Sequence, residues 1–175
     1  KDYRDAIDAA GERTGLAYFP PSWEKEGTHW GNTETLWPTP IFSPNDPWVA
    51  ALMQEVRERY MGGFIEGTIQ WTDGKTISAI HPYMSAYTTM ASLARGEHEK
   101  VVEEFYWHLL HSSATHGFPE GIFYKRRFAW SNTIPHVTGA SNYALMLRHM
   151  LVHEQDNELH LLMAIPDWWL EGGAI

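Results

Sequence analysis

The chain repeats one helical pattern about every 50 residues, and this recurrence limits its possible folds more than any other feature of the sequence. Helical stretches with apolar residues at spacings of three and four begin near Asp2, Pro47 and Glu97. Each leads into a long loop rich in aromatic residues, then a second helical stretch and a short turn. Because paired helices in such units are antiparallel, the long loops emerge at one end. The repeat therefore predicts stacked αα-hairpins with their long loops on a single rim.

Local signals set the expected boundaries of these elements. Asp46 before Pro47 predicts a helix start, because an aspartate caps free N–H groups and proline suits the first helical position. Gly96 predicts a short turn between helices, and the apolar run 158–165 before Pro166 predicts one strand. The expected helices cover residues 2–13, 30–42, 47–61, 83–94, 97–112 and 136–153. The sequence thus predicts an all-α domain over residues 1–175, with hairpins at about 2–42, 47–94 and 97–153 and a short C-terminal β-strand.

Composition excludes several classes of protein. The 175 residues carry a net charge of −9, so a phosphate-binding surface is not expected and nucleic acid is excluded as a partner. No apolar run reaches the roughly 18 residues that a membrane span requires. The absence of cysteine excludes a disulfide scaffold and leaves the compartment open, with a secreted or periplasmic location favoured over the cytoplasm. Aromatic residues make up 14% of the chain, with nine tryptophans, which favours a ring-lined cleft.

Two glutamates bracketed by glycine are the candidate catalytic residues. Glu66 lies in Gly63-Phe-Ile-Glu-Gly67, and Glu120 lies in a corresponding loop with Pro119 before it and Gly121 after it. Recurrence in matching loops of the repeat favours a functional role for both. Taken singly, each carboxylate could instead cap a helix or pair with an arginine, for which the sequence offers Arg126 and Arg127.

Histidines and aromatic residues in the same loops are candidate substrate ligands. His29, His81 and His136 stand at the starts of the second helices of the three units, where each could also serve as a simple cap. The residues expected to line the cup, by ring stacking or by hydrogen bonds to hydroxyl groups, are Trp30, Trp71, His81, Phe118, Tyr124, Trp130, Asn132 and His136. The pair His149 and His153 has the spacing of zinc ligands but lacks the intervening glutamate, so no metal is expected.

Four segments resemble bacterial six-hairpin glycosidase-like proteins, and the likeness extends from about Thr28 onward. They are His81-Pro-Tyr-Met-Ser-Ala-Tyr-Thr-Thr, Leu110-His-Ser-Ser-Ala-Thr-His-Gly-Phe-Pro-Glu-Gly, Pro135-His136 leading into Leu145-Met-Leu-Arg-His-Met-Leu-Val-His-Glu154, and Leu159-His-Leu-Leu-Met-Ala-Ile-Pro-Asp-Trp-Trp-Leu170. The resemblance implies an (α/α)6 toroid with its active site in the cup of long loops. Six hairpins need about twelve helices, so the chain resembles the C-terminal half of a toroid. The missing half is then expected from the parent chain or from a second chain.

For such a protein the resemblance implies hydrolysis of a poly- or oligosaccharide by two carboxylates, without a cofactor. We expect Glu120 to act as general acid and Glu66 as base or substrate ligand, with about 6.5–9.5 Å between them in an inverting enzyme. A non-catalytic module that binds glycan or protein in the same cup is an alternative. A polysaccharide lyase is another, in which Arg126 or Arg127 would neutralise a uronate.

Overall fold

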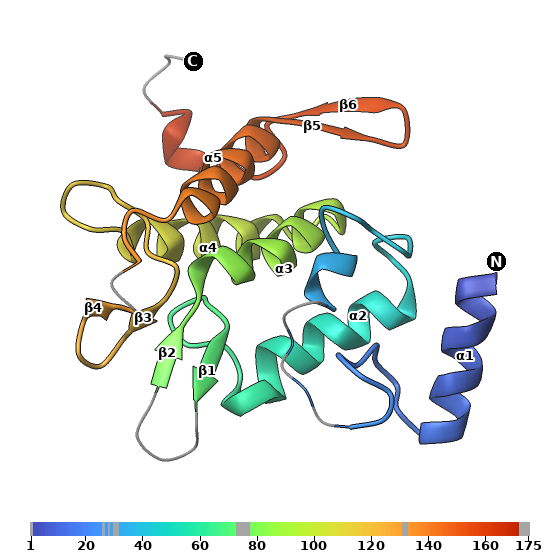
Figure 1. The fold of residues 1–175 in the computed structure, drawn as a ribbon. Helices are drawn as coiled ribbons and strands as arrows, with labels where there is room; N and C mark the ends of the chain where they lie inside the picture. Colours follow the sequence, from blue (N-terminus) through green and yellow to red (C-terminus); the bar gives the residue numbers. More distant parts are fainter. Residues whose placement is uncertain are drawn as a thin grey trace.

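The computed structural model describes residues 2–25, 27, 29, 32–72, 78–130 and 133–171 (Figure 1). The helices are α1 (Asp2–Thr14), α2 (Pro47–Gln54), α3 (Pro82–Ala94), α4 (His98–Leu110) and α5 (Val137–Leu151). A π-helical segment, η2 (Glu55–Arg59), extends α2, and 3-10 turns form at η1 (Thr33–Thr35), η3 (Tyr60–Gly62) and η5 (Asp167–Trp169). The strands are β1 (Gln70–Thr72), β2 (Ser78–Ile80), β3 (Ile122–Phe123), β4 (Phe128–Ala129), β5 (Val152–Gln155) and β6 (Glu158–Leu161).

The prediction of an all-α fold with a single short strand is wrong. The structure is 48% helical and 13% strand, and it contains antiparallel sheets of four and two strands. The strands of the larger sheet are two or three residues long, which is too short for apolar alternation to stand out in a sequence. Their pairing depends on contacts between distant segments, so the aromatic loops gave no local signal of a sheet.

The larger sheet joins the two long loops that carry the glycine-bracketed glutamates. Its strand order is β1-β2-β3-β4, with Trp71 opposite Ala79 and Ile80 opposite Ile122 (Figure 1). Because β2 leads directly into α3 and the β3–β4 hairpin precedes α5, the sheet holds the N-terminal ends of both helices near each other. Two of the long loops therefore meet at the N-terminal ends of α3 and α5.

The predicted helix at residues 30–42 is also wrong over the described residues. That stretch forms only the turn η1, after which the chain continues irregularly. Pro38 and Pro40 lack the N–H groups that a helix interior needs, so a helix cannot continue through them. The N–H of Ile41 instead donates to the carbonyl of Thr35 at 3.1 Å, which closes a wide loop. This loop lies against α3 through η1.

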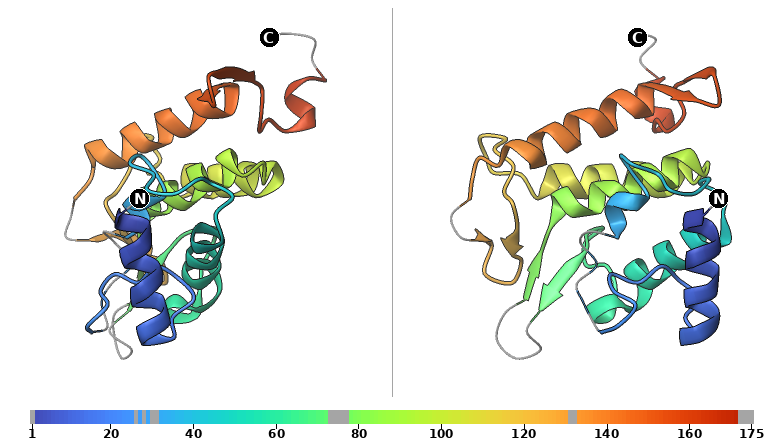
Figure 2. Two further views of the ribbon diagram at one scale, coloured as in Figure 1. Left: turned by 90° about the vertical axis from the view of Figure 1, so that its right-hand side faces the viewer. Right: turned by 45° about the vertical axis from the view of Figure 1, so that its right-hand side comes forward.

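Helix α3 lies at the centre of the molecule and belongs to both apolar cores. Its residues Met84, Tyr87 and Ala91 pack with Leu52 and the rest of the α2 cluster. The opposite side of α3 packs with α4 and α5, through a cluster made of Ala86, Met90, Leu93, Val101, Phe105, Met146, Met150 and Ala164. Figure 2 shows α5, the α3–α4 pair and α2 as successive layers. A helix buried on nearly all sides has to be apolar or small around its whole circumference, and α3 is.

A buried ion pair fixes η2 against α3 and α4. The guanidinium of Arg57 donates to both carboxylate oxygens of Glu104 at 3.0 Å, and the hydroxyl of Thr89 donates to the same carboxylate at 2.5 Å. Burial raises the pKa of Glu104, while Arg57 and Thr89 act in the opposite direction. The network gives each buried charge a partner, which a buried charge requires.

The C-terminal hairpin β5–β6 leaves apolar side chains in solvent. Leu159 and Leu161 of β6 are exposed, as is Leu162 directly after it. Coverage of an open apolar edge by more chain was expected from the sequence, and it stays a prediction. None of the helices in the described ranges is both long and apolar enough to cross a membrane.

Candidate functional site

The N-terminal end of α3 brings His81 against the loop that carries Glu120. The His81 side chain is buried, and burial lowers its pKa. A Cβ atom on Gly121 would lie 2.7 Å from two atoms of the His81 ring, so only glycine allows this close approach. Gly121 therefore has a packing role: because it has no side chain, the His81 ring can contact the loop that carries Glu120.

Aromatic rings from the four-stranded sheet surround this histidine. Trp130 lies 5.6 Å from the His81 ring and 5.4 Å from Trp71, in edge-to-face arrangements. Phe123 of β3 stacks on Trp130 at 5.1 Å. Because these rings come from β1, β3 and the residue after β4, the sheet holds them together. Perpendicular and offset ring pairs are the favourable geometries for aromatic side chains.

Tyr83, in the first turn of α3, is half-buried within the electrostatic range of two carboxylates. Its pKa is raised to about 12, mainly by burial and then by Glu120, Tyr87 and Glu34 in that order. Glu120 is half-buried on the loop before β3, whereas Glu34 is exposed on η1. Glu34 also raises the pKa of Tyr87 one turn further along α3. Carboxylates from two segments that are distant in the sequence therefore both act on the pKa of Tyr83, Glu120 more strongly than Glu34.

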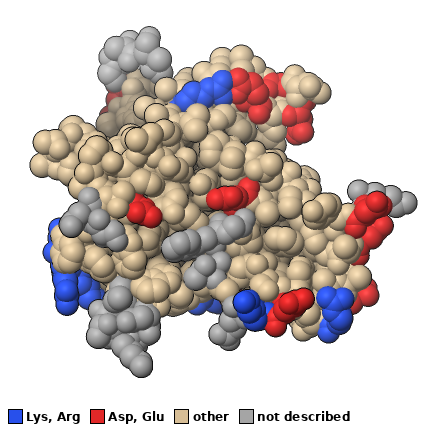
Figure 3. All heavy atoms as spheres, in the orientation of Figure 1, with Lys and Arg blue, Asp and Glu red and all other residues tan. Residues whose placement is uncertain are grey.

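We call this arrangement the Tyr83 site and define it by Glu34, His81, Tyr83, Glu120 and Trp130. The face drawn in Figure 3 is largely uncharged over α3 and the start of α5, where acidic atoms appear only in isolated spots. Lys and Arg lie mainly along its edges. Carboxylates that stand apart from cations keep their oxygens available for a ligand, so the Tyr83 site can offer acid–base chemistry.

Glu66 is not part of the Tyr83 site. Both of its carboxylate oxygens accept from the guanidinium of Arg127, at 2.9 and 3.0 Å. Its backbone carbonyl accepts from Nε2 of His111 at 3.1 Å. Pairing with an arginine is one of the alternatives that the sequence left open for this residue. Both oxygens of Glu66 are therefore engaged in a bidentate pair with an arginine.

The remaining sequence-predicted ligands are dispersed. His136 lies 5.0 Å from the Tyr83 ring, and its Nδ1 accepts from the N–H of Gly139 at 3.2 Å, so it also caps α5. Phe118 is buried against Tyr143 in the core, 4.7 Å away. Tyr124 follows β3, where Lys125 lies over its ring. Trp30 and Asn132 lie outside the described residues.

Sequence reasoning missed Glu34 and Tyr83. Glu34 falls in a stretch predicted as helix, and only its proximity to α3 in the structure indicates a role. Tyr83 could have been found, because it directly follows His81 and Pro82 at a predicted helix start on the rim.

The two histidines that the sequence suggested as possible zinc ligands lie next to each other in the structure. Nδ1 of His149 and Nδ1 of His153 are 3.0 Å apart, but neighbouring Glu154 bonds to Arg148. No group of three or more potential metal ligands occurs among the residues that the structure describes. Comparison of the chain with protein-family profiles, with curated proteins and with solved structures gives no match.

Proposed function

We propose that this chain is a glycoside hydrolase that acts on a poly- or oligosaccharide, with Glu120 and Glu34 as its two carboxylates. The proposal rests on the placement of the two residues: Glu120 lies on the loop that packs against His81 at the start of α3, and Glu34 lies on η1, which contacts α3. Hydrolysis of a glycosidic bond needs one carboxylic acid at the leaving oxygen and a second carboxylate across the sugar. Two carboxylates from separate segments around one aromatic side chain fit that requirement.

The surroundings of each carboxylate suggest its role. Glu120 is half-buried on the loop that packs against His81, close to the aromatic cluster, which is a suitable position for a general acid that faces a bound sugar. Glu34 is exposed, which suits a base that activates a water molecule. Tyr83 stays protonated at neutral pH and can donate a hydrogen bond to a carboxylate or a sugar hydroxyl. The rings of Trp71 and Trp130 can pack against sugar faces.

Two further observations support hydrolysis over the alternatives. The segments that resemble six-hairpin glycosidase-like proteins include His81, Tyr83 and Glu120. A lyase that used Tyr83 as its base would need the ionised phenol. Burial and neighbouring carboxylates keep the Tyr83 phenol protonated at neutral pH, which disfavours proton abstraction by this residue. Of the two arginines considered for a uronate, Arg127 is bound to Glu66.

The test compares three glutamate-to-glutamine variants on a panel of aryl glycosides and oligosaccharides. We expect Glu120→Gln and Glu34→Gln each to lower kcat/KM by about a thousandfold or more, since each removes a proton-transferring group. Glu66→Gln is the matched control, because it makes the same change at an ion-paired carboxylate. It should lower kcat/KM by less than about tenfold.

The controls separate catalysis from binding. Circular dichroism should give the same spectrum for all three variants, and calorimetry with a substrate should give similar dissociation constants. Binding without turnover in the wild-type chain would favour the non-catalytic module. Loss of activity in Glu66→Gln alone would refute the pairing of Glu120 with Glu34.

A further inference from the structure

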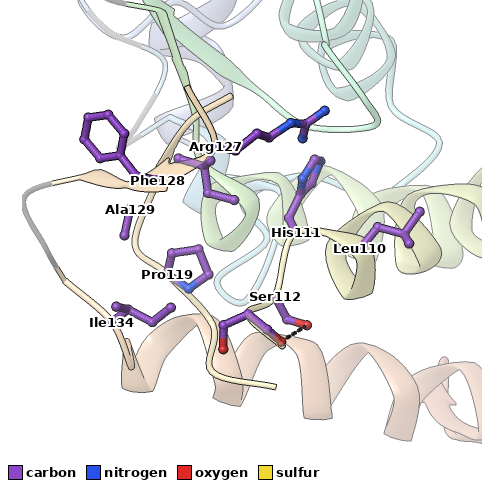
Figure 4. A pocket seen from close by; sticks show the side chains of 10 residues that line it. Leu110, His111, Ser112, Pro119, Arg127, Phe128, Ala129 and Ile134 are labelled. Atoms are coloured by element: carbon purple, nitrogen blue, oxygen red, sulfur yellow. Dashed lines mark hydrogen bonds between the residues drawn. The ribbon is translucent and has the colours of Figure 1, made fainter. Parts of the chain in front are cut away.

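Two features outside the Tyr83 site are candidates for a further role. One is an open pocket of about 200 Å³ between the end of α4 and the β3–β4 hairpin, whose walls are largely apolar (Figure 4). The other is the contact between His149, near the end of α5, and His153 of β5. The histidine contact has the more specific chemistry, because its hydrogen bonds give the ring nitrogens defined roles.

The β5–β6 hairpin buries one side chain against the rest of the protein, that of His153. Helix α5 passes into β5 with no residue between them, and the hairpin extends beyond the end of the helix (Figures 1 and 2). His153 is 7% exposed, and it is the one buried residue in the range 152–161, all of which the structure describes. Leu159 and Leu161 of β6 are 61% and 63% exposed. The side chain that anchors this hairpin is therefore an imidazole and not an apolar group.

The hydrogen bonds of the two histidines assign their ring protons. Nδ1 of His149 lies 3.2 Å from Nη1 of Arg148 and 3.0 Å from Nδ1 of His153. A guanidinium can only donate, so Nδ1 of His149 accepts, and Nδ1 of His153 carries the proton that it donates to the same atom. His149 then has its own proton on Nε2. The contact therefore requires His149 to be neutral.

Cationic and donor groups surround the contact. A proton added to Nδ1 of His149 would face the guanidinium of Arg148 and the N–H of His153. Burial lowers the pKa of His149, and His153 and Arg148 lower it further. Burial also lowers the pKa of His153, as does His160, its cross-strand neighbour on β6. Both rings therefore stay neutral at neutral pH while the hairpin is attached.

The nearby groups that favour the charged rings do not reverse this direction. Glu154 raises the pKa of both rings, and Gln155 raises that of the β5 ring. The carboxylate of Glu154 is paired with Arg148, however, and Glu158 lies beside His160 of its own strand, at 3.7 Å. Burial outweighs these contributions, so the pKa of each ring is lowered overall.

We propose that the contact between His149 and His153 is a pH switch that attaches the β5–β6 hairpin to the end of α5 and releases it in mild acid. A proton on Nδ1 of His149 breaks the hydrogen bond, and the buried ring of His153 loses its partner. In the released hairpin both rings face water and have the ordinary histidine pKa of about 6.5. Protons therefore bind preferentially to the released form. Below about pH 6.5 release is favoured by up to about tenfold per pH unit for each histidine that becomes charged.

Hydrogen exchange of the hairpin amides measures this release. A two-stranded hairpin is only marginally stable by itself, so its cross-strand hydrogen bonds should open readily once it is released. We expect the protection factors of β5 and β6, corrected for the intrinsic effect of pH, to fall at least about tenfold between about pH 7.5 and about pH 5.5. Protection in α3 should stay higher than in the hairpin at both pH values. A chelator in every sample removes any contribution from bound metal.

Unchanged protection of the hairpin would overturn the proposal. Equal protection factors in the hairpin and in α3 at the lower pH would also overturn it, because the hairpin would then open only when the entire chain unfolds.

Glutamine variants identify the histidine responsible. His149→Gln keeps a side-chain oxygen that can accept from Arg148 and His153 but cannot be protonated near neutral pH. Its hairpin protection should fall less than about threefold over the same pH range. His98→Gln makes the same change at an exposed histidine at the start of α4, and it should respond to pH as the wild-type chain does. A wild-type response in His149→Gln would contradict the proposal.

The tautomers of the wild-type chain give a check that needs no variant. Long-range nitrogen–proton correlation spectra of the imidazoles at neutral pH should show His149 protonated on Nε2 and His153 protonated on Nδ1. The opposite assignment for either ring would contradict the proposal whether or not the variants fold.

Discussion

At the scale of single residues, Gly121 sets the distance between the Glu120 loop and His81. An added methyl group would lie 2.7 Å from two imidazole atoms and 3.2 Å from the carbonyl of Ile80. We expect Gly121→Ala to lower the free energy of unfolding by about 1–3 kcal/mol, because these buried atoms have little room to move. Urea denaturation followed by circular dichroism measures the change.

Gly117→Ala is the matched control for Gly121→Ala. Its closest contact would be the Ser113 hydroxyl at 3.2 Å, a small group that can rotate away. The free energy of unfolding should change by less than about 1 kcal/mol. Equal losses in the two variants would show that close contact with His81 is not what makes Gly121 necessary.

The buried imidazole of His29 makes stability depend on pH. Burial lowers its pKa from 6.5 to about 4, and its ring packs against Tyr60 at 4.5 Å. Between these two pKa values the unfolded chain binds a proton that the folded chain does not. The free energy of unfolding therefore falls as the pH decreases through this window and levels off below about pH 4, with a loss of at most about 3 kcal/mol.

A His29→Gln variant tests this dependence. Urea unfolding at pH values between about 7 and 4.5 should show a smaller loss of stability in the variant than in the wild-type chain. Identical slopes would mean that other groups account for the acid sensitivity. His81, whose pKa burial also lowers, contributes with the same sign in both proteins.

Part of the Tyr83 site could be predicted from the sequence. Glu120 was identifiable from its glycine-bracketed aromatic loop, and His81 from its place before a proline at a helix start. Glu34 was not, because a three-residue turn has no periodic pattern and its neighbours suggested a helix. Glu66 has the same local signature as Glu120, and only the fold reveals its bond to Arg127.

At the scale of elements, the cap of α2 joins two helices. Asp46 accepts from the N–H of Trp48 at 2.9 Å and also pairs with Arg4 of α1. We expect Asp46→Ala to lower the free energy of unfolding by about 1–2 kcal/mol. Asp46→Asn keeps a capping oxygen and loses only the ion pair, so its cost should be less than half as large. Thermal unfolding of both variants gives the comparison, and equal costs would assign the effect to Arg4.

Helices were predictable because their signals are local. The expected starts of α2 and α3 were correct to within one residue, since each rests on a proline at the first helical turn. The strands were not, except for the β6 segment, because two or three residues carry no period and their partners lie far along the chain. The π-helical turn η2 was likewise missed.

At the scale of the whole molecule, the Arg57–Glu104 pair is the main buried electrostatic contact between the α2 layer and the α3–α4 layer. We expect Glu104→Leu to lower the free energy of unfolding by about 3–5 kcal/mol, because the buried Arg57 charge loses its two hydrogen bonds to a carboxylate and keeps only the more distant Glu97, at 3.6 Å. The double variant Arg57→Met with Glu104→Leu should recover much of that loss. A double-mutant cycle from urea unfolding measures the coupling, and strict additivity would mean that the pair does not interact.

The central position of α3 also determines how the site behaves as the protein fluctuates. His81 and Tyr83 begin a helix whose other residues belong to both apolar cores. Opening the site by unravelling α3 would expose both cores, so the amide protons of this helix should exchange with solvent only when the entire chain unfolds. Most residues of α1 are exposed, so the amide protons of this helix should exchange through local unfolding, which requires less free energy than unfolding of the whole chain. The hydrolysis proposed for this site should then persist on heating until the cooperative melting transition itself.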